Sequence, residues 1–178
     1  MRTFFNKGQD MSECIEIKIK YIDKKVPELK KINIGNWIDL SINRIEVLES
    51  SFSYIEDKVY QLDQLDFVHL VRWDFIKVYF GIAMELPEGY EAHVKPRSST
   101  FRKYGLIQTN GVGVIDTSYC GDNDEWFAPM LVLKQFSLVK KYTRVCQFRI
   151  VPEMPNINLV KVDSLDNPDR NGDGSTGD

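Results

Sequence analysis

Cysteine and histidine, from which disulfide frameworks and many metal centres are built, are scarce in this chain. Its three cysteines, Cys14, Cys120 and Cys146, are an odd number and include no CxxC pair. Its two histidines, His69 and His93, lie far apart and have no other ligand types at metal-binding spacing. Neither a disulfide framework nor a zinc site is therefore predicted. We expect the cysteines to be small buried hydrophobes or surface thiols, and His93 to be a strand residue.

Long apolar runs and a surplus of positive charge are also missing. No run approaches the roughly 18 apolar residues of a membrane helix, and no signal peptide is recognisable, so we expect no membrane association and a cytoplasmic location. The 23 lysines and arginines oppose 26 acidic residues, which gives a net charge of -3 and a pI near 5.5. Proteins that bind nucleic acid through a basic surface neutralise many phosphates at once. A small phosphorylated ligand therefore suits this chain better than a nucleic acid.

Helical periodicity is sparse, whereas apolar and polar residues alternate repeatedly. Residues 14–21 alternate strictly, which is typical of a half-buried strand. Further strands are expected at residues 37–42, within 67–80, from 81 into a turn near Gly89, at 91–94, at 126–135 and at 142–151. Residues 54–65 fit a short helix or a strand. Strand following strand at short spacing in a chain of 178 residues predicts one all-β barrel or sandwich domain.

Residues 94–122 place phosphate-binding residue types ahead of a single carboxylate. A basic, hydroxyl-rich loop comes first and consists of Pro96, Arg97, Ser98, Ser99 and Thr100. An apolar run, a turn at Asn110 and Gly111, and a second apolar run then lead to Asp116. The planar fork of arginine matches phosphate oxygens, and hydroxyls and backbone amides can fill the remaining acceptor positions. Because a positioned aspartate can take a proton from water, this order predicts hydrolysis of a phosphorylated ligand.

The tail from residue 156 has the composition of a mobile segment. Its last nine residues nevertheless concentrate a guanidinium, glycines and hydroxyls, in Arg170, Gly172, Gly174, Ser175, Thr176 and Gly177. Backbone amides freed by glycine, together with such donors, are suited to phosphate. The segment is not a P-loop, because no lysine follows the glycines.

Short segments of the chain resemble, in order, the motifs of the trimeric dUTP pyrophosphatases (dUTPases). They are WIDL at 37–40, PRSS at 96–99, GVIDTSYCGD at 113–122, TRVCQ at 143–147 and DRNGDGSTG at 169–177. The flanks GIAMELPEGYEAHV and IQTNGVGVID are most similar to Bacillus and phage members. The resemblance implies an all-β subunit of the dUTPase-like β-barrel or jelly-roll (β-clip) type, which forms a homotrimer with shared active sites. It also implies Mg²⁺-dependent hydrolysis of dUTP to dUMP and pyrophosphate, in the cytoplasm of a bacterial or phage-infected host cell.

The same resemblance implies roles for residues around the base and the sugar. In the family, the acid of GVID activates the water that attacks the α-phosphorus, and this role falls on Asp116. The tyrosine that follows, Tyr119, packs on the deoxyribose and leaves no room for a 2'-hydroxyl. The hairpin between the two apolar runs reads uracil largely with backbone groups, at Asn110, Gly113 and Ile115.

For the phosphates, the resemblance implies contacts from two parts of the chain. Arg97 and Ser98 bind the α and β phosphates, with Ser99 nearby, and Gln147 contacts the water or phosphate region. Asp39 helps to organise the metal and water environment. The tail of a neighbouring subunit closes over the γ-phosphate through Arg170, Gly174, Ser175 and Thr176. Mg²⁺ is held mainly by the substrate phosphates, and the resemblance identifies no direct protein ligand.

By the same comparison, the chain divides into a flexible leader at 1–12, a dUTPase-like β domain at 13–162 and a mobile C-terminal arm at 163–178. The region around 43–80 is longer than in compact members and is expected to hold an insertion. Residues 45–80 of this region are a candidate docking surface for a protein partner. Two alternative functions stay open at this point. They are a dCTP deaminase of the same superfamily and a phage or regulatory protein-binding module on the same fold.

Two positions depart from the family pattern. Asp173 stands where most members have an aromatic residue that covers the uracil, which leaves Trp126 or Phe127 as substitutes. Tyr142 replaces the glycine that normally opens the fourth motif, so the turn geometry there is open to question.

Overall fold

The computed structural model describes residues 14–31, 34–50, 59–60 and 67–169. The expected leader at 1–12 lies outside these residues, as do Asp173 and the predicted phosphate-binding residues of the tail, which are Arg170, Gly174, Ser175 and Thr176. The expectations for these segments therefore stay predictions.

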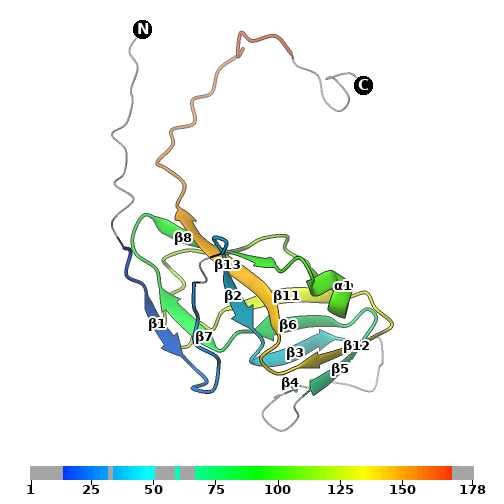
Figure 1. Cartoon of the computed structure of the whole chain (residues 1–178). Coiled ribbons are helices and arrows are strands. Elements are labelled where there is room, and N and C mark those ends of the chain that lie inside the picture. The colour runs from blue at the N-terminus through cyan, green and yellow to red at the C-terminus, as the bar shows by residue number, and fades with distance from the viewer. Residues whose placement is uncertain (1–13, 32–33, 51–58, 61–66, 170–178) are drawn as a thin grey trace.

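Antiparallel strands in several sheets form the described part of the chain (Figure 1). A four-stranded sheet has the order β10 (Gly113–Ile115), β8 (Tyr90–Pro96), β13 (Arg144–Pro152), β2 (Ile38–Ser41). A five-stranded sheet has the order β4 (Val59–Tyr60), β3 (Arg44–Glu49), β6 (Phe75–Tyr79), β11 (Phe127–Val132), β9 (Leu106–Gln108). Two further pairs join β1 (Lys18–Tyr21) to β7 (Ile82–Glu85) and β12 (Phe136–Lys140) to β5 (Phe67–Val71). The predicted all-β fold is confirmed.

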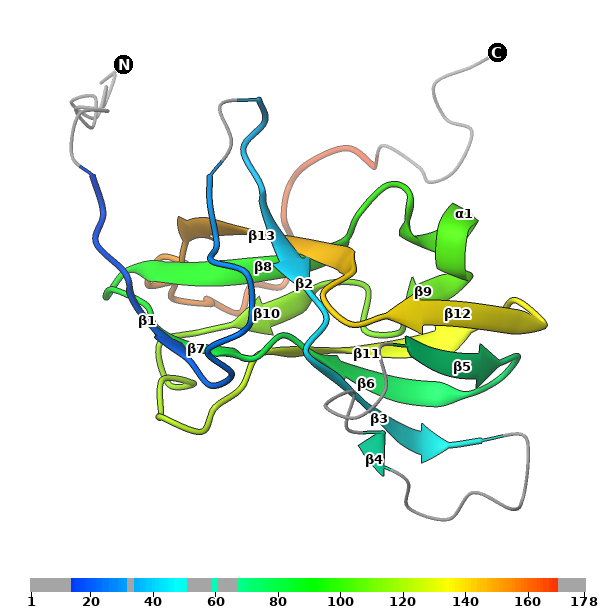
Figure 2. The ribbon, with the colours of Figure 1, turned by 60° about the horizontal axis from the view of Figure 1, so that its bottom comes forward.

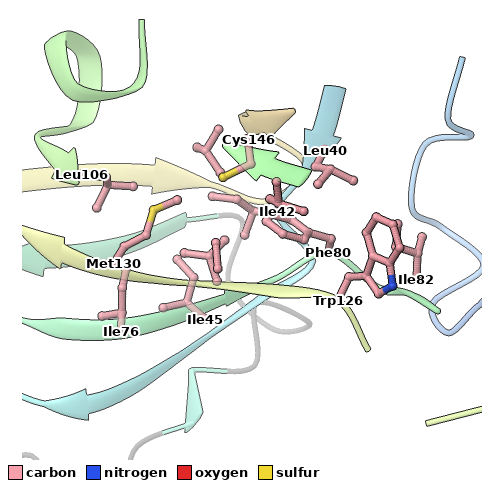
Figure 3. Close-up of a cluster of buried hydrophobic side chains, with 14 of the residues drawn as sticks. Leu40, Ile42, Ile45, Ile76, Phe80, Ile82, Leu106, Trp126, Met130 and Cys146 are labelled. Atoms are coloured by element: carbon pink, nitrogen blue, oxygen red, sulfur yellow. The ribbon is translucent and has the colours of Figure 1, made fainter. Parts of the chain in front are cut away.

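The four-stranded sheet lies above the five-stranded sheet in the view of Figure 2, and the apolar side chains that alternate along their strands meet between them (Figure 3). Leu40 and Cys146 come from the four-stranded sheet, whereas Ile45, Ile76 and Met130 come from the five-stranded sheet, and all are fully buried. Burial of a large apolar side chain contributes about 1.5–3 kcal/mol, so this cluster is the main source of stability. Burial also raises the pKa of the Cys146 thiol, whereas Cys14 and Cys120 are exposed.

Several strand boundaries differ from those that the sequence predicts. The first strand begins only at Lys18. Its apolar residue Ile19 is 37% exposed, so this side chain is less buried than the alternating pattern predicts. Residues 67–80 form β5 and β6, separated by a turn in which Trp73 has a φ of 76° and Asp74 accepts a hydrogen bond from the Val71 amide at 2.8 Å. Strand β12 was not expected as a separate element. The range 43–80, predicted to hold an insertion, contains β3 and β6, which are inner strands of the five-stranded sheet.

Strand β8 brings the distant motifs together, because it pairs with β10 on one side and with β13 on the other. Gly113 lies opposite Val94, Gln147 lies opposite Lys95, and on the far side of β13 Gln147 also lies opposite Asp39. Directly opposed residues in antiparallel strands project from the same face. Asp39, Lys95 and Gln147 therefore project from one face of this sheet, opposite the face that buries Leu40 and Cys146 in the core.

Tyr142, which stands where the resemblance expects a glycine, lies in the turn that precedes β13. It has a φ of 61°, in the left-handed region that favours glycine. Hydrogen bonds from the Tyr142 amide to the Ile42 carbonyl and from the Ile42 amide to the Thr143 carbonyl, at 2.8 and 2.9 Å, hold the turn. Tyr142 therefore adopts a backbone conformation that glycine would adopt without strain.

After β13, residues 153–169 extend away from the sheets, and all of them are exposed (Figure 1). Among the described residues, no helix is long and apolar enough to cross a membrane.

Candidate active site

The link between β9 and β10 crosses from the five-stranded to the four-stranded sheet. The sequence predicts a hairpin here, but β9 pairs with β11 and β10 pairs with β8, so the two strands are not partners. Gly111 supplies a left-handed turn with a φ of 67°. Gln108 Nε2 donates hydrogen bonds to the Val94 carbonyl at 3.2 Å and to Asn110 Oδ1 at 2.8 Å. These bonds fix the link beside a cavity that is lined by residues of β10 and β11.

The cavity has a volume of about 350 Å³. Its lining residues are Asn110, Gly113, Val114, Ile115, Asp116, Ser118, Tyr119, Phe127 and Pro129. Asn110, Gly113, Ile115, Asp116 and Tyr119, to which the resemblance gives roles at the base, the sugar and the attacking water, are among them. The volume lies within the usual range for small-molecule sites, about 300–1,000 Å³. A second cavity of about 460 Å³, next to Lys24 and Lys141, contains none of the predicted site residues.

Asp116 is an exposed carboxylate whose orientation is set by Ser118. Its Oδ1 atom accepts hydrogen bonds from the hydroxyl and from the backbone amide of Ser118, the latter at 2.8 Å. Hydrogen bonding from the Ser118 side chain, and then from its amide, lowers the pKa of Asp116 below its usual value. The group is therefore ionised at neutral pH, and its Oδ2 atom has no hydrogen-bond partner within the described residues. Sequence reasoning did not single out Ser118, although its place two residues after Asp116 is typical of such a turn.

Tyr119 forms the side of the cavity next to Asp116. Its hydroxyl donates to the backbone carbonyl of Glu125 at 3.2 Å, and its ring is half-buried against the core. Burial, followed by the nearby Asp124 and Glu125 carboxylates, raises the pKa of Tyr119. The phenol therefore stays neutral and holds the ring in place.

A second group of predicted residues lies on the shared face of β2, β8 and β13. Asp39 Oδ1 lies 2.7 Å from Arg97 Nε, and Asp39 Oδ2 lies 2.9 Å from Arg144 Nη1. Gln147 Nε2 donates to the Pro96 carbonyl at 3.4 Å. Arg144 was not selected from the sequence, although it lies in the segment TRVCQ. Only the pairing of β13 with β2 reveals that it shares Asp39 with Arg97.

The loop that carries Arg97 is tied to the start of β13. The Arg97 amide donates to the Val145 carbonyl at 3.0 Å, and the buried Thr100 hydroxyl donates to the same carbonyl at 2.6 Å. Ser98 is exposed at the tip, and Ser99 is half-buried at the start of α1 (Thr100–Tyr104). The loop is thus fixed while Arg97 and Ser98 face outward.

The structure does not bring the two groups into one cavity. Arg97, Ser98, Ser99, Gln147 and Asp39 are all missing from the lining of the 350 Å³ cavity. One copy of the described chain therefore presents two separate half-sites.

The fit to a divalent cation depends on the carboxylates that remain free. In the part of the chain that the structure describes, no cluster of three or more histidine, cysteine or acidic residues could hold a metal. Both oxygens of Asp39 are engaged by guanidinium groups. Mg²⁺ often uses only one or two protein carboxylates together with substrate phosphates. The residues present fit an ion that is bound mainly through phosphate oxygens.

Of the two aromatic residues proposed to cover the base, only Phe127 reaches the cavity. Trp126 is fully buried and packs edge-on against Phe148, with ring centroids 5.2 Å apart, so the expectation for Trp126 is wrong. Neighbouring residues of a strand point to opposite faces, which explains the difference.

Comparison with known proteins gives a consistent assignment. A model of the dUTPase family matches residues 68–177. The SPbeta prophage-derived deoxyuridine 5'-triphosphate nucleotidohydrolase YosS of Bacillus subtilis is 47% identical over 163 residues, which cover 92% of this chain and 99% of that protein. The enzyme of the same name from Heliobacterium modesticaldum is 26% identical and covers 92% of this chain and 94% of its own length.

Solved structures agree on the fold. The Streptococcus mutans dUTPase has a TM-score of 0.59 at 21% identity, and covers 80% of this chain and 98% of its own. A mutant dUTPase of Staphylococcus bacteriophage 80alpha with dUpNHpp has a TM-score of 0.64 at 16% identity, with coverages of 91% and 98%. The relative from the Bacillus subtilis prophage confirms the resemblance to Bacillus and phage members that the sequence indicates. The chain belongs to the dUTPase family.

Proposed function

We propose that the chain hydrolyses dUTP to dUMP and pyrophosphate, with Asp116 as the general base. The observation that carries this proposal is the cavity in which the ionised Asp116 meets Tyr119, Asn110 and the backbone of β10. Water attacks the α-phosphorus and gives a proton to Oδ2 of Asp116. A bond forms between the water oxygen and the α-phosphorus, the bridge to the β-phosphate breaks, and pyrophosphate leaves.

Recognition of the nucleoside follows from the cavity walls. The neutral Tyr119 ring lies against the deoxyribose and excludes a 2'-hydroxyl. Backbone groups between Asn110 and Ile115 pair with the edge of uracil, whereas cytosine presents its donor and acceptor interchanged. A buried backbone group left unpaired costs about 1–3 kcal/mol, which supports rejection of dCTP.

Recognition of the phosphates rests on the second group. Arg97 and Ser98 bind the α and β phosphates, with Ser99 and Gln147 nearby, and Arg144 adds a further guanidinium. Asp39 holds the guanidinium groups of Arg97 and Arg144 on one face of the sheet. Bound Mg²⁺ would offset the charge of the triphosphate and fix its geometry.

The separation of the two half-sites supports a homotrimer with shared active sites. The cavity of one copy carries the base, sugar and water residues, and Arg97 with its neighbours comes from another copy. The tail residues Arg170, Gly174, Ser175 and Thr176 close over the γ-phosphate of a neighbour. The enzyme acts in the cytoplasm of a bacterial or phage-infected cell.

The direct test is Mg²⁺-dependent release of pyrophosphate from dUTP by the wild type and by Asp116→Asn. Loss of a general base lowers kcat by about 10²–10⁴-fold. Incubation with dCTP and detection of ammonia tests the deaminase alternative in the same preparation. Ammonia release without pyrophosphate, or full activity of Asp116→Asn, would overturn the proposal.

A further inference from the structure

A row of three side chains crosses the outer face of the five-stranded sheet and ends at the cavity. Arg44 on β3 lies opposite Tyr79 on β6, and Tyr79 lies opposite Phe127 on β11. The side chains on this face are half-buried, whereas their strand neighbours Ile45, Val78 and Ala128 are fully buried in the core. Arg44 does not line the 350 Å³ cavity, so its contacts reach the cavity through its neighbours.

Arg44 is held by a carboxylate on one edge and by a ring on one face. Its Nε and Nη2 atoms donate to Glu125 Oε2 at 3.0 and 2.7 Å. Its Cζ atom lies 3.4 Å from the centre of the Tyr79 ring. Glu125 is 6% exposed, and its other oxygen accepts a hydrogen bond from the Gly81 amide at 2.8 Å. A planar guanidinium can stack on a ring while its edge donates two parallel hydrogen bonds, whereas an ammonium has no planar face to stack.

The stack continues from Tyr79 to Phe127. The Tyr79 hydroxyl donates to Glu46 Oε2 at 2.7 Å, and its ring centre lies 5.4 Å from that of Phe127, with an interplanar angle of 42°. Burial, followed by the bond to Glu46, raises the pKa of Tyr79 to about 12, so the phenol stays a donor at neutral pH. The position of the Phe127 ring is thereby linked to Arg44.

A second aromatic lining residue of the cavity, Tyr119, is linked to the same Arg44–Glu125 pair. The Glu125 backbone carbonyl accepts the hydrogen bond from the Tyr119 hydroxyl, and the Glu125 side chain binds Arg44. Tyr119 and Phe127, two aromatic walls of one cavity, are therefore both connected to the Arg44–Glu125 ion pair.

We propose that Arg44 is a positioning residue for the nucleotide cavity, acting through Glu125 on Tyr119 and through Tyr79 on Phe127. The proposal rests on the proposed function, in which Tyr119 excludes the 2'-hydroxyl. If Arg44 sets the placement of that ring, its loss must reduce the preference for dUTP over UTP as well as the affinity for dUTP. A residue that only stabilises the fold would change both substrates alike.

The test compares Arg44→Lys, which keeps the charge and loses the planar fork, with Tyr79→Phe, which keeps the ring and loses the bond to Glu46. Lys18→Gln is the matched control, because it removes an exposed ion pair with Glu85 at 2.9 Å, on strands β1 and β7. We expect Arg44→Lys to raise the KM for dUTP about tenfold and to lower the dUTP/UTP ratio of kcat/KM by a similar factor, with little change in kcat. Tyr79→Phe should show a smaller change in the same direction, and Lys18→Gln none.

Binding of non-hydrolysable dUTP and UTP analogues to the same variants decides the proposal independently of turnover. The role of Arg44 is supported if Arg44→Lys binds the dUTP analogue more weakly and the ratio of its affinities for the dUTP and UTP analogues falls. This result would hold even if the wild type does not hydrolyse dUTP and the proposed function fails. The proposal would be overturned if this ratio of affinities is unchanged in Arg44→Lys, whether both affinities are kept or both are lost equally.

Discussion

Asp39 and Arg97, which are 58 residues apart in the sequence, form an ion pair of 2.7 Å across the face of the four-stranded sheet. The second oxygen of Asp39 holds Arg144 at 2.9 Å. One carboxylate therefore orients two guanidinium groups, so the proposed phosphate half-site is arranged before any phosphate binds. Such preorganisation reduces the ordering cost of substrate binding.

Asp39→Asn tests this arrangement. The amide cannot hold two cations, so we expect the KM for dUTP to rise about five- to tenfold while the free energy of unfolding changes by less than about 1 kcal/mol. Steady-state kinetics and urea unfolding measure the two effects. Asp23→Asn is the matched control, because Asp23 makes a similarly exposed ion pair with Lys141 at 3.2 Å. An unchanged KM in Asp39→Asn would show that the guanidinium groups need no such support.

Ser118→Ala tests the ionisation of Asp116. The Ser118 hydroxyl is the largest cause of the lowered pKa of Asp116, so its removal must raise that pKa. Because the base acts when ionised, the acid limb of the kcat/KM profile should move to higher pH, while the rate on the plateau changes little. Ser118→Thr keeps the hydroxyl and should leave the limb in place. A limb that stays fixed in Ser118→Ala would assign the titration to another group.

Mixed assemblies test the sharing of half-sites between copies. Arg97→Ala and Asp116→Asn each remove a different half-site, so each variant alone should be nearly inactive. When the two are unfolded together and refolded, some active sites combine an intact Arg97 from one copy with an intact Asp116 from another. Pyrophosphate release above the sum of the separate variants is expected. Activity equal to that sum would place both groups in a site made by one chain.

Gly81→Ala tests the packing around the Arg44–Glu125 pair. Gly81 has a φ of 69°, and an added Cβ would lie 2.6 Å from Val26 Cγ2 and 3.0 Å from Asn43 Cβ. We expect a loss of about 2–4 kcal/mol from overpacking and left-handed strain together. Gly89→Ala is the control, since its φ is 84° and nothing lies within 4 Å of the added atom, so strain alone should cost about 1–2 kcal/mol. Equal losses in urea unfolding would contradict the close approach at Gly81.

Local pattern predicts the fold class, because strict alternation of apolar and polar residues indicates strands. The residues expected around the base, the sugar and the attacking water came instead from the resemblance to the dUTPases, and the structure places Asn110, Asp116 and Tyr119 around one cavity. Strand β12 lies in the gap between the expected strands at 126–135 and 142–151 and was not predicted, since a short run with few turn signals has little local signature.

The site residues that the sequence could not predict depend on the register with which the strands pair. Arg144 belongs to the site because β13 pairs with β2, and no local pattern encodes that pairing. Trp126 and Phe127 look equivalent as neighbours, and only the burial of one strand face decides that Phe127 reaches the cavity. The link from Arg44 to the cavity likewise requires two successive strand pairings across the sheet.

The central claim is attack of water on the α-phosphorus with Asp116 as its base. Turnover of dUTP by the wild-type enzyme in water labelled with heavy oxygen, followed by mass spectrometry of both products, tests it most directly. The account predicts that the label enters dUMP and is missing from pyrophosphate. Label in pyrophosphate would place the attack at the β-phosphorus and contradict the account.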